Sequence, residues 1–316
     1  MTIQLVCLAL ILLLAVLRLP RALRRPQARP AWWASIAGVV SLTTYGTPVS
    51  SAVYDHFLGG QNLLTLLRDL AAVAAFWFMR EALAGYSRSA KRYAPPWVLA
   101  IMLAVITGLF LLIQHRSPTT TTFVMDQIAQ PASWLYGTAY MGALVWILAD
   151  SARLTWRVGR SVVRVITAGA VLTGLGCLFE ILVLTAAHFG WGASLFRSTL
   201  AETSAVPFFT GLTTMLLGIA GAAVLLPLKR RVLFGRLHRI GRRRRLASQP
   251  TLLPLAVLSP ERQLVAQTHH LLVELGNAKY AGRFTPTDGE SAVIRQVEAL
   301  FRPATDFQPI TVGKAA

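Results

Sequence analysis

The chain has 316 residues, of which 54% are hydrophobic and only 14% are charged, and its formal net charge is +18. Soluble domains average about 25% charged residues, so this composition and the mean hydropathy of +0.54 exclude an ordinary soluble globular protein. The two cysteines, Cys7 and Cys177, both lie in apolar runs, which argues against a disulfide framework or a cysteine-based zinc site. A lipid bilayer is therefore the expected solvent for most of the chain.

Seven apolar segments are long enough to cross a membrane, because a transmembrane helix needs about 20 mostly apolar residues. In chain order they cover residues 3–19, 31–54, 63–83, 97–113, 133–152, 165–187 and 208–226. The first has the length of a signal peptide, but no basic region precedes it and arginines follow it at once, so we interpret it as an uncleaved anchor. The sequence thus predicts an all-α fold in which residues 1–228 form a multi-pass bundle of about seven transmembrane helices.

Basic residues repeat at every second connection between these segments. Residues 18–29, 80–92, 153–164 and 229–245 each hold four or more Lys or Arg, whereas the alternate connections hold only Arg116 and Arg197. Because cytoplasmic loops are enriched in Lys and Arg, we predict a bacterial plasma-membrane protein with its N-terminus outside and its C-terminus in the cytoplasm. Basic residues that bind nucleic acid would not repeat at every second connection between membrane segments, so no nucleic-acid partner is expected. The positive charge instead predicts contact with anionic lipid.

The second segment is unusually polar and contains a proline, which removes a backbone hydrogen bond that neighbouring groups must replace. We expect this helix to pack inside the bundle or to line a cavity, and packing is the simpler interpretation because Ser and Thr commonly join helices. We interpret the glycines of segments six and seven in the same way. The polar positions are Ser41, Thr43, Thr44, Tyr45, Thr47, Ser50 and Ser51, around Gly46 and Pro48, and the glycines are Gly169, Gly174, Gly176, Gly211, Gly218 and Gly221.

Three ionisable residues, Arg68, Asp69 and Glu180, fall inside the apolar segments, where charges are costly and often functional. Arg68 lies about 9 Å and Glu180 about 12 Å from the outer ends of their helices at 1.5 Å per residue. Their similar depths predict an Arg68–Glu180 pair, with Asp69 facing another helix or water. Such a pair would either fix helix packing or form a substrate or proton site, and we take these three residues as the candidate intramembrane polar cluster.

Three histidines lie in or beside different outer connections, each near a carboxylate. Zinc and copper bind such groups, but no HxH or HExxH spacing supports a site, so we expect no metal. The sequence also has no Walker loop, dinucleotide fingerprint, GxSxG elbow or CxxC pair, so we expect no cofactor and no enzymatic activity. The histidines are His56, His115 and His188, and the carboxylates are Asp55, Asp126 and Glu202.

The C-terminal part is expected to consist of a basic juxtamembrane segment and linker, 229–258, and a cytoplasmic two-helix tail, 259–316. The first tail helix would open at Ser259 with Pro260 at its first position, and the second would open at Thr287 with a capping box to Glu290. Two helices this short bury little core alone. We therefore expect them to pack on the membrane domain, on a second copy of the chain or on a cytoplasmic protein partner.

The layout resembles a family of actinobacterial integral membrane proteins that are assigned to transport and join seven spans to a small helical cytoplasmic domain. The resemblance covers most of the chain, and it implies transport without indicating a substrate or site residues. The matching features are the arginine-rich loop 18–29, the run Gly59, Gly60, Gln61, Asn62 and Leu63, the exit at Leu226 and Pro227, and the tail residues Leu264, Leu271 and Leu272.

Two functions are compatible with these features. A secondary transporter is favoured by the polar second segment and the buried charges, although no inverted repeat is visible in the sequence. The alternative is a membrane sensor that passes a signal to a cytoplasmic partner through its C-terminal helices. A membrane-embedded enzyme comes last, because no catalytic constellation is present.

Overall fold

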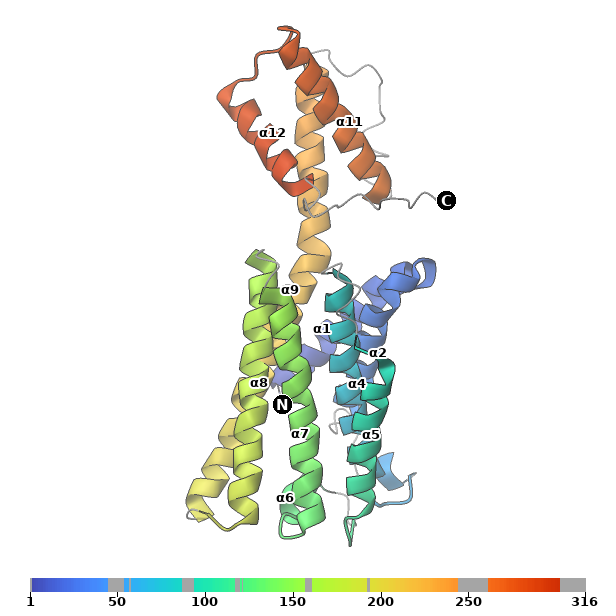
Figure 1. Ribbon diagram of the computed structural model, residues 1–316, viewed down its shortest axis with the longest axis vertical. Coiled ribbons are helices and arrows are strands. Elements are labelled where there is room, and N and C mark those ends of the chain that lie inside the picture. Colours follow the sequence, from blue (N-terminus) through green and yellow to red (C-terminus); the bar gives the residue numbers. More distant parts are fainter. Residues whose placement is uncertain are drawn as a thin grey trace, which may run out of the picture. The chain divides into compact units, whose positions relative to one another are not determined.

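The computed structural model describes residues 2–44, 54–56, 58–86, 94–116, 120, 122–156, 161–191, 194–243 and 261–301. All regular secondary structure within these ranges is helical (Figure 1). The prediction of an all-α fold is therefore confirmed. The helices are α1 (Thr2–Arg24), the 3-10 helix η1 (Pro26–Ala28), α2 (Arg29–Thr43), α4 (Leu63–Tyr86), α5 (Pro96–Leu111), α6 (Phe123–Asp126), α7 (Pro131–Trp156), α8 (Ser161–His188), α9 (Ser194–Arg243), α11 (Glu261–Tyr280) and α12 (Asp288–Phe301).

Four of the described helices are long and apolar enough to cross a membrane, at Gln4–Arg24, Pro131–Trp156, Val163–His188 and Ala205–Ala222. Helix α5 is apolar but has only 16 residues, and the 24 residues of α4 include four charged side chains. The described part of α2 has 15 residues, and the polar positions from Tyr45 to Ser51 lie outside the described residues. Four of the seven expected spans thus meet the requirements of length and composition.

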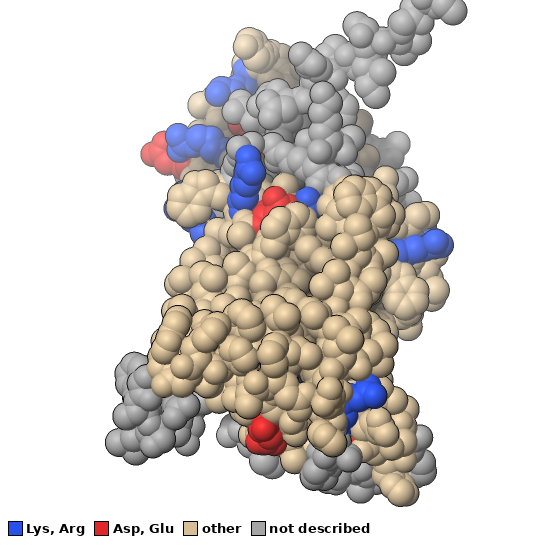
Figure 2. Space-filling model, turned by 60° about the horizontal axis from the view of Figure 1, so that its bottom comes forward, with Lys and Arg blue, Asp and Glu red and all other residues tan. Residues whose placement is uncertain are grey.

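The surface of the helical bundle agrees with this assignment. On the face seen in Figure 2, the broad middle of the bundle shows no charged side chain, and the charged side chains gather towards its ends. Large apolar side chains are also exposed on the candidate spans, among them Leu13 at 51%, Leu182 at 65% and Leu217 at 55%. Apolar side chains exposed in this way suit a bilayer, which does not penalise them as water does.

The chain divides into two compact units, 1–222 and 223–316, and the boundary falls within α9. In the first unit α7 packs along α8, α2 packs along both α1 and α4, and α7 also contacts α4 and α5. Figure 1 shows α4 and α5 side by side, as it does α7 and α8. Helix α4, which carries the buried charges, thus lies among three neighbouring helices.

Glycines allow α8 and α9 to approach closely. A Cβ atom built on Gly169 would lie 2.5 Å from the backbone nitrogen of Met215, and one on Gly176 would lie 2.6 Å from that of Phe208. From the other side, a Cβ on Gly211 would overlap the backbone nitrogen of Thr173. The interpretation as helix-packing residues is confirmed for Gly169, Gly176 and Gly211, since backbone atoms occupy the space that a side chain would need.

Replacing Gly169 or Gly211 by alanine should push α8 and α9 apart and lower the stability of the first unit by about 1–3 kcal/mol, as overpacking generally does. The measurement is thermal unfolding of the purified protein in detergent, followed by circular dichroism. Gly142→Ala is the matched control, because no atom lies within 4 Å of its Cβ position. Equal melting temperatures for the three variants would contradict the close approach.

The second unit has a hydrophobic core built by three helices. The core is formed by Leu233, Phe234, Leu237 and Ile240 of α9, by Leu271, Leu275 and Ala278 of α11, by Val297 of α12, and by Phe284 between the last two helices. The residues 229–243, expected in a basic linker, are therefore helical and supply one side of this core. Their apolar residues recur at helical spacing, and the surrounding exposed arginines obscure that stripe in the sequence.

The expected capping box at the start of α12 is present. The backbone nitrogen of Thr287 donates to Glu290 Oε2 at 2.9 Å, and the backbone nitrogen of Glu290 donates to Thr287 Oγ1 at 3.3 Å. The expected start of the preceding helix at Ser259 and Pro260 lies outside the described residues.

Candidate functional site

The beginning of α4 is held by a buried aspartate. The carboxylate of Asp55 accepts hydrogen bonds from the backbone nitrogens of Asn62 at 2.8 Å and of Leu64 at 2.9 Å. Asp55 and Asn62 are both fully buried, and the backbone of Asn62 has a positive φ of 56°. Gly59 and Gly60 also have positive φ, which glycine adopts without strain. This turn satisfies the first amide groups of α4 and so fixes where the charged helix begins.

Two residues of the predicted polar cluster, Arg68 and Asp69, lie in contact on α4. Asp69 is only 2% exposed, and its Oδ1 accepts a hydrogen bond from Arg68 Nε at 2.9 Å. Its Oδ2 accepts one from the hydroxyl of Tyr136 on α7 at 2.6 Å. Asp69 therefore faces another helix, as expected. The two hydrogen bonds stabilise a buried carboxylate that would be costly if left unpaired.

The third predicted residue, Glu180, is partly buried on α8. Helix α8 packs mainly on α7, and α4 packs on α2, α5 and α7. Helix α7 therefore contacts both α4, which carries Arg68, and α8, which carries Glu180. Arg68 donates a hydrogen bond to Asp69 on its own helix. The Arg68–Glu180 pair stays a prediction.

A second ion pair, which the sequence did not predict, joins α4 to α7. Arg80 is 5% exposed, and its Nη2 lies 2.6 Å from Oδ2 of Asp150. The guanidinium also contacts Glu81 and lies over the ring of Trp77, 5.9 Å from its centroid. In the sequence Arg80 is only one of the basic residues that indicate the topology, and Asp150 near the end of an apolar segment is the signal that could have identified its partner.

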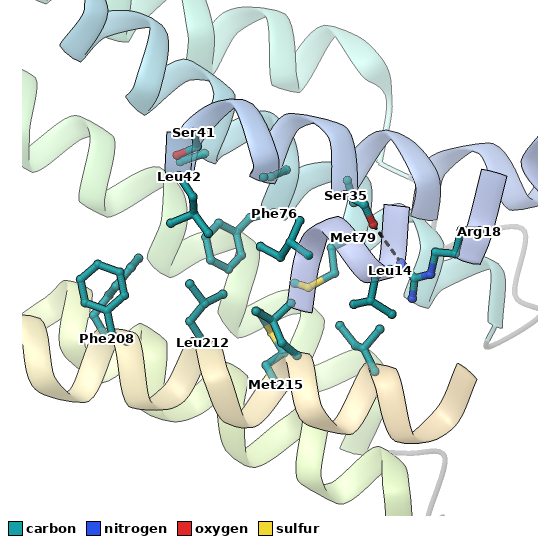
Figure 3. A pocket seen from close by; sticks show the side chains of 18 of the residues that line it. Leu14, Arg18, Ser35, Ser41, Leu42, Phe76, Met79, Phe208, Leu212 and Met215 are labelled. Carbon is teal, nitrogen blue, oxygen red and sulfur yellow. Dashed lines mark hydrogen bonds between the residues drawn. The ribbon is translucent and has the colours of Figure 1, made fainter. Parts of the chain in front are cut away.

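An apolar pocket of about 80 Å³ lies among α1, α2, α4, α7 and α9 (Figure 3). Most of its wall consists of leucine, isoleucine, methionine and phenylalanine side chains. Phe208 and Leu42 lie towards one end in Figure 3, and Arg18 and Ser35 lie towards the other. Only four side chains with polar atoms line it, namely Arg18, Ser35, Ser41 and Tyr140. The lining is thus mainly apolar with a few polar groups, a composition common in the lining of ligand sites.

The polar cluster does not line this pocket, but it lies next to it. The pocket wall on α4 includes Ala72, Phe76 and Met79, and Asp69 precedes Ala72 by three residues on the same helical face. On α7, Tyr140 lines the pocket and follows Tyr136 by one turn, about 5.4 Å along the axis. The Asp69–Tyr136 hydrogen bond is therefore about one helical turn from the pocket.

No group of three His, Cys, Asp or Glu side chains suited to a metal ion occurs among the described residues. The Nδ1 atom of His188 lies 2.7 Å from the carbonyl oxygen of Ile128, and its ring stacks on Trp134 with centroids 4.9 Å apart. These contacts give His188 a packing role at the end of α8. The side chain of Glu202 lies outside the described residues.

The chain matches no model of a known protein family, and comparisons with curated proteins and with solved structures find no match either. The resemblance to the actinobacterial family therefore stays an expectation. Among the described residues, the pocket and the polar contacts beside it form the candidate functional site.

Replacing Tyr136 by phenylalanine should lower the stability of the first unit by about 1–3 kcal/mol, because the buried Asp69 then loses a hydrogen-bond donor. Thermal unfolding in detergent measures the effect. Tyr54→Phe is the matched control, since Tyr54 is 41% exposed and an exposed hydroxyl is easily replaced by water. If both variants unfold at the temperature of the wild type, the hydrogen bond to Asp69 does not stabilise the bundle.

Proposed function

We propose that this chain is a multi-pass integral protein of the bacterial plasma membrane that acts as a secondary transporter for a small, mainly apolar molecule. The observation that carries the proposal is the pocket among α1, α2, α4, α7 and α9. Binding sites of carriers commonly lie between helices within the membrane, where the helices can move around a bound substrate.

The proposed topology has seven spans, with the N-terminus outside and the C-terminus in the cytoplasm. Each of the seven apolar segments overlaps a long helix of the structure, so α2, α4 and α5 join the four longer spans in this proposal. The charges of α4 do not oppose its insertion, because Asp69 and Arg80 are buried and paired within the protein. The basic residues at alternate connections support the orientation and an interaction with anionic lipid.

In this proposal Arg68, Asp69 and Glu180 form the intramembrane polar site beside the pocket. Asp69 pairs with Arg68 on its own helix and holds α4 to α7 through Tyr136, about one turn from the pocket wall. The resemblance to the actinobacterial family also supports transport.

Cysteine accessibility tests the transporter without knowledge of its substrate. With Cys7 and Cys177 replaced by alanine, Ser41→Cys places one thiol in the pocket wall. A carrier exposes its site to each side in turn, so a membrane-impermeant thiol reagent should modify this cysteine in right-side-out and in inverted vesicles. The rate of modification on each side should also respond to Asp69→Asn.

Thr173→Cys is the control, because Thr173 is fully buried between α8 and α9 and does not line the pocket. It should resist the reagent from both sides. Modification of the Ser41→Cys protein from one side only, under all conditions, would show that the pocket does not change its access and would exclude transport through it.

The alternative function is a membrane sensor that acts on a cytoplasmic partner or associates with a second copy through its C-terminal helices. The observation that favours it is the core of the second unit, which makes this part a folded module. Helix α9 contributes residues both to the pocket and to that core, so the two units share one continuous helix.

Hydrogen–deuterium exchange of the full chain in nanodiscs distinguishes the two functions. A sensor should respond to Asp69→Asn with altered amide exchange in α11 and α12. A transporter should confine the change to residues 1–222. Val297→Ala is the positive control, because Val297 is fully buried in the core of the second unit and its truncation loosens α12 directly.

A further inference from the structure

Arg18 belongs to the pocket and not only to the basic loop that follows α1. It lines the pocket together with Ile11 and Leu14, and the spacing of three and four residues places all three on one face of α1. Its Nη1 donates to the carbonyl oxygen of Ala31 at 2.9 Å and lies 3.5 Å from Ser35 Oγ. Figure 3 shows the guanidinium directed towards Ser35 at one end of the pocket.

The charge of Arg18 is compensated differently from the charges of Arg68 and Arg80 on α4. Arg68 and Arg80 each pair with an aspartate, whereas the described residues offer Arg18 only neutral oxygen atoms. A guanidinium has five N–H donors in a planar fork that matches a carboxylate or a phosphate. The structure thus places an anion-binding group at one end of an otherwise apolar pocket.

The pocket extends away from Arg18 along α9. Its wall on this helix runs from Ile219 to Phe208, a length of about 16 Å at 1.5 Å per residue. Cys7 of α1 contacts Thr213 of α9 at 3.2 Å, and Figure 3 shows Phe208 at one end of the pocket and Arg18 at the other. An elongated apolar wall with a cation at one end is complementary to an aliphatic chain with an anionic head.

We propose that the pocket binds a free single-chain anionic amphiphile, with its carboxylate on Arg18 and its aliphatic chain towards Phe208. The inference rests on the proposed function in taking the pocket as the substrate site, and it adds the chemical class of the substrate. Arg18 sets the preference for an anion, while Leu42, Phe76, Leu212 and Met215 contact the chain.

Equilibrium dialysis with labelled laurate at pH 8 tests this, using the full chain in phosphatidylcholine nanodiscs and subtracting the uptake of empty nanodiscs. The wild type should bind laurate saturably. Arg18→Gln should weaken this binding by about tenfold to a hundredfold, as the loss of a hydrogen bond to a charged group does, and Arg18→Lys should restore part of it. Binding of 1-dodecanol, which has the same chain without the charge, should change less than about threefold.

Arg24→Gln is the matched control, because Arg24 is exposed on the same helix and does not line the pocket. It should bind laurate as the wild type does. Leu212→Trp fills the pocket and should weaken laurate and dodecanol alike. The proposal is overturned if laurate does not bind saturably, if Arg18→Gln binds it with unchanged affinity, or if that variant loses both ligands equally.

Nanodiscs that contain phosphatidylglycerol distinguish the source of the anion. Laurate binding should persist in them, and its abolition would assign the pocket to a membrane phospholipid and overturn the proposal. The outcomes also separate this inference from transport. If the Ser41→Cys thiol is modified from both sides but laurate does not bind, transport is retained and the laurate site is rejected. If laurate binds but the thiol is modified from one side only, the laurate site is retained and transport is rejected.

Discussion

Helix α4 carries four charged side chains through the first unit, and the packing around it depends on how these charges are compensated. Near its beginning Asp69 bonds to Tyr136, and near its end Arg80 pairs with Asp150. Both partners lie on α7, so the two helices are joined at two levels. A buried charge without a partner costs far more than a buried pair, and this difference keeps α4 and α7 in one register. The pocket wall on α4 lies between these two contacts.

The pocket combines an apolar lining with one guanidinium group. Its apolar lining comes from five helices, and its main charged group is an arginine whose bonds are to neutral oxygens. Transport and sensing both begin with binding at such a site, and they differ in the step after binding. Helix α9 connects the site to the second unit along one chain of helical hydrogen bonds, which is the structural reason for keeping sensing as an alternative.

The sequence predicted those features that depend on local composition. Hydropathy found the helical segments, the glycines of segments six and seven were interpreted as packing residues, and Thr287 with Glu290 predicted the capping box. It missed Tyr136, because a neutral side chain in an apolar helix gives no signal until its partner is known. It placed residues 229–258 in a basic juxtamembrane segment and linker, and the high density of arginine obscured the apolar stripe that residues 229–243 form in α9. The pocket needs residues from five separate helices and has no sequence signature.

The close contact of α8 with α9 has a consequence for how this gene can vary. Every missense change in a glycine codon adds at least a β-carbon, and at Gly169 or Gly211 that atom meets backbone of the opposite helix. Backbone cannot move aside as a long side chain can, so no single-base missense change is conservative at these two codons. Natural variants of the gene should therefore be depleted of substitutions there, while codons for exposed lipid-facing leucines drift freely among apolar residues.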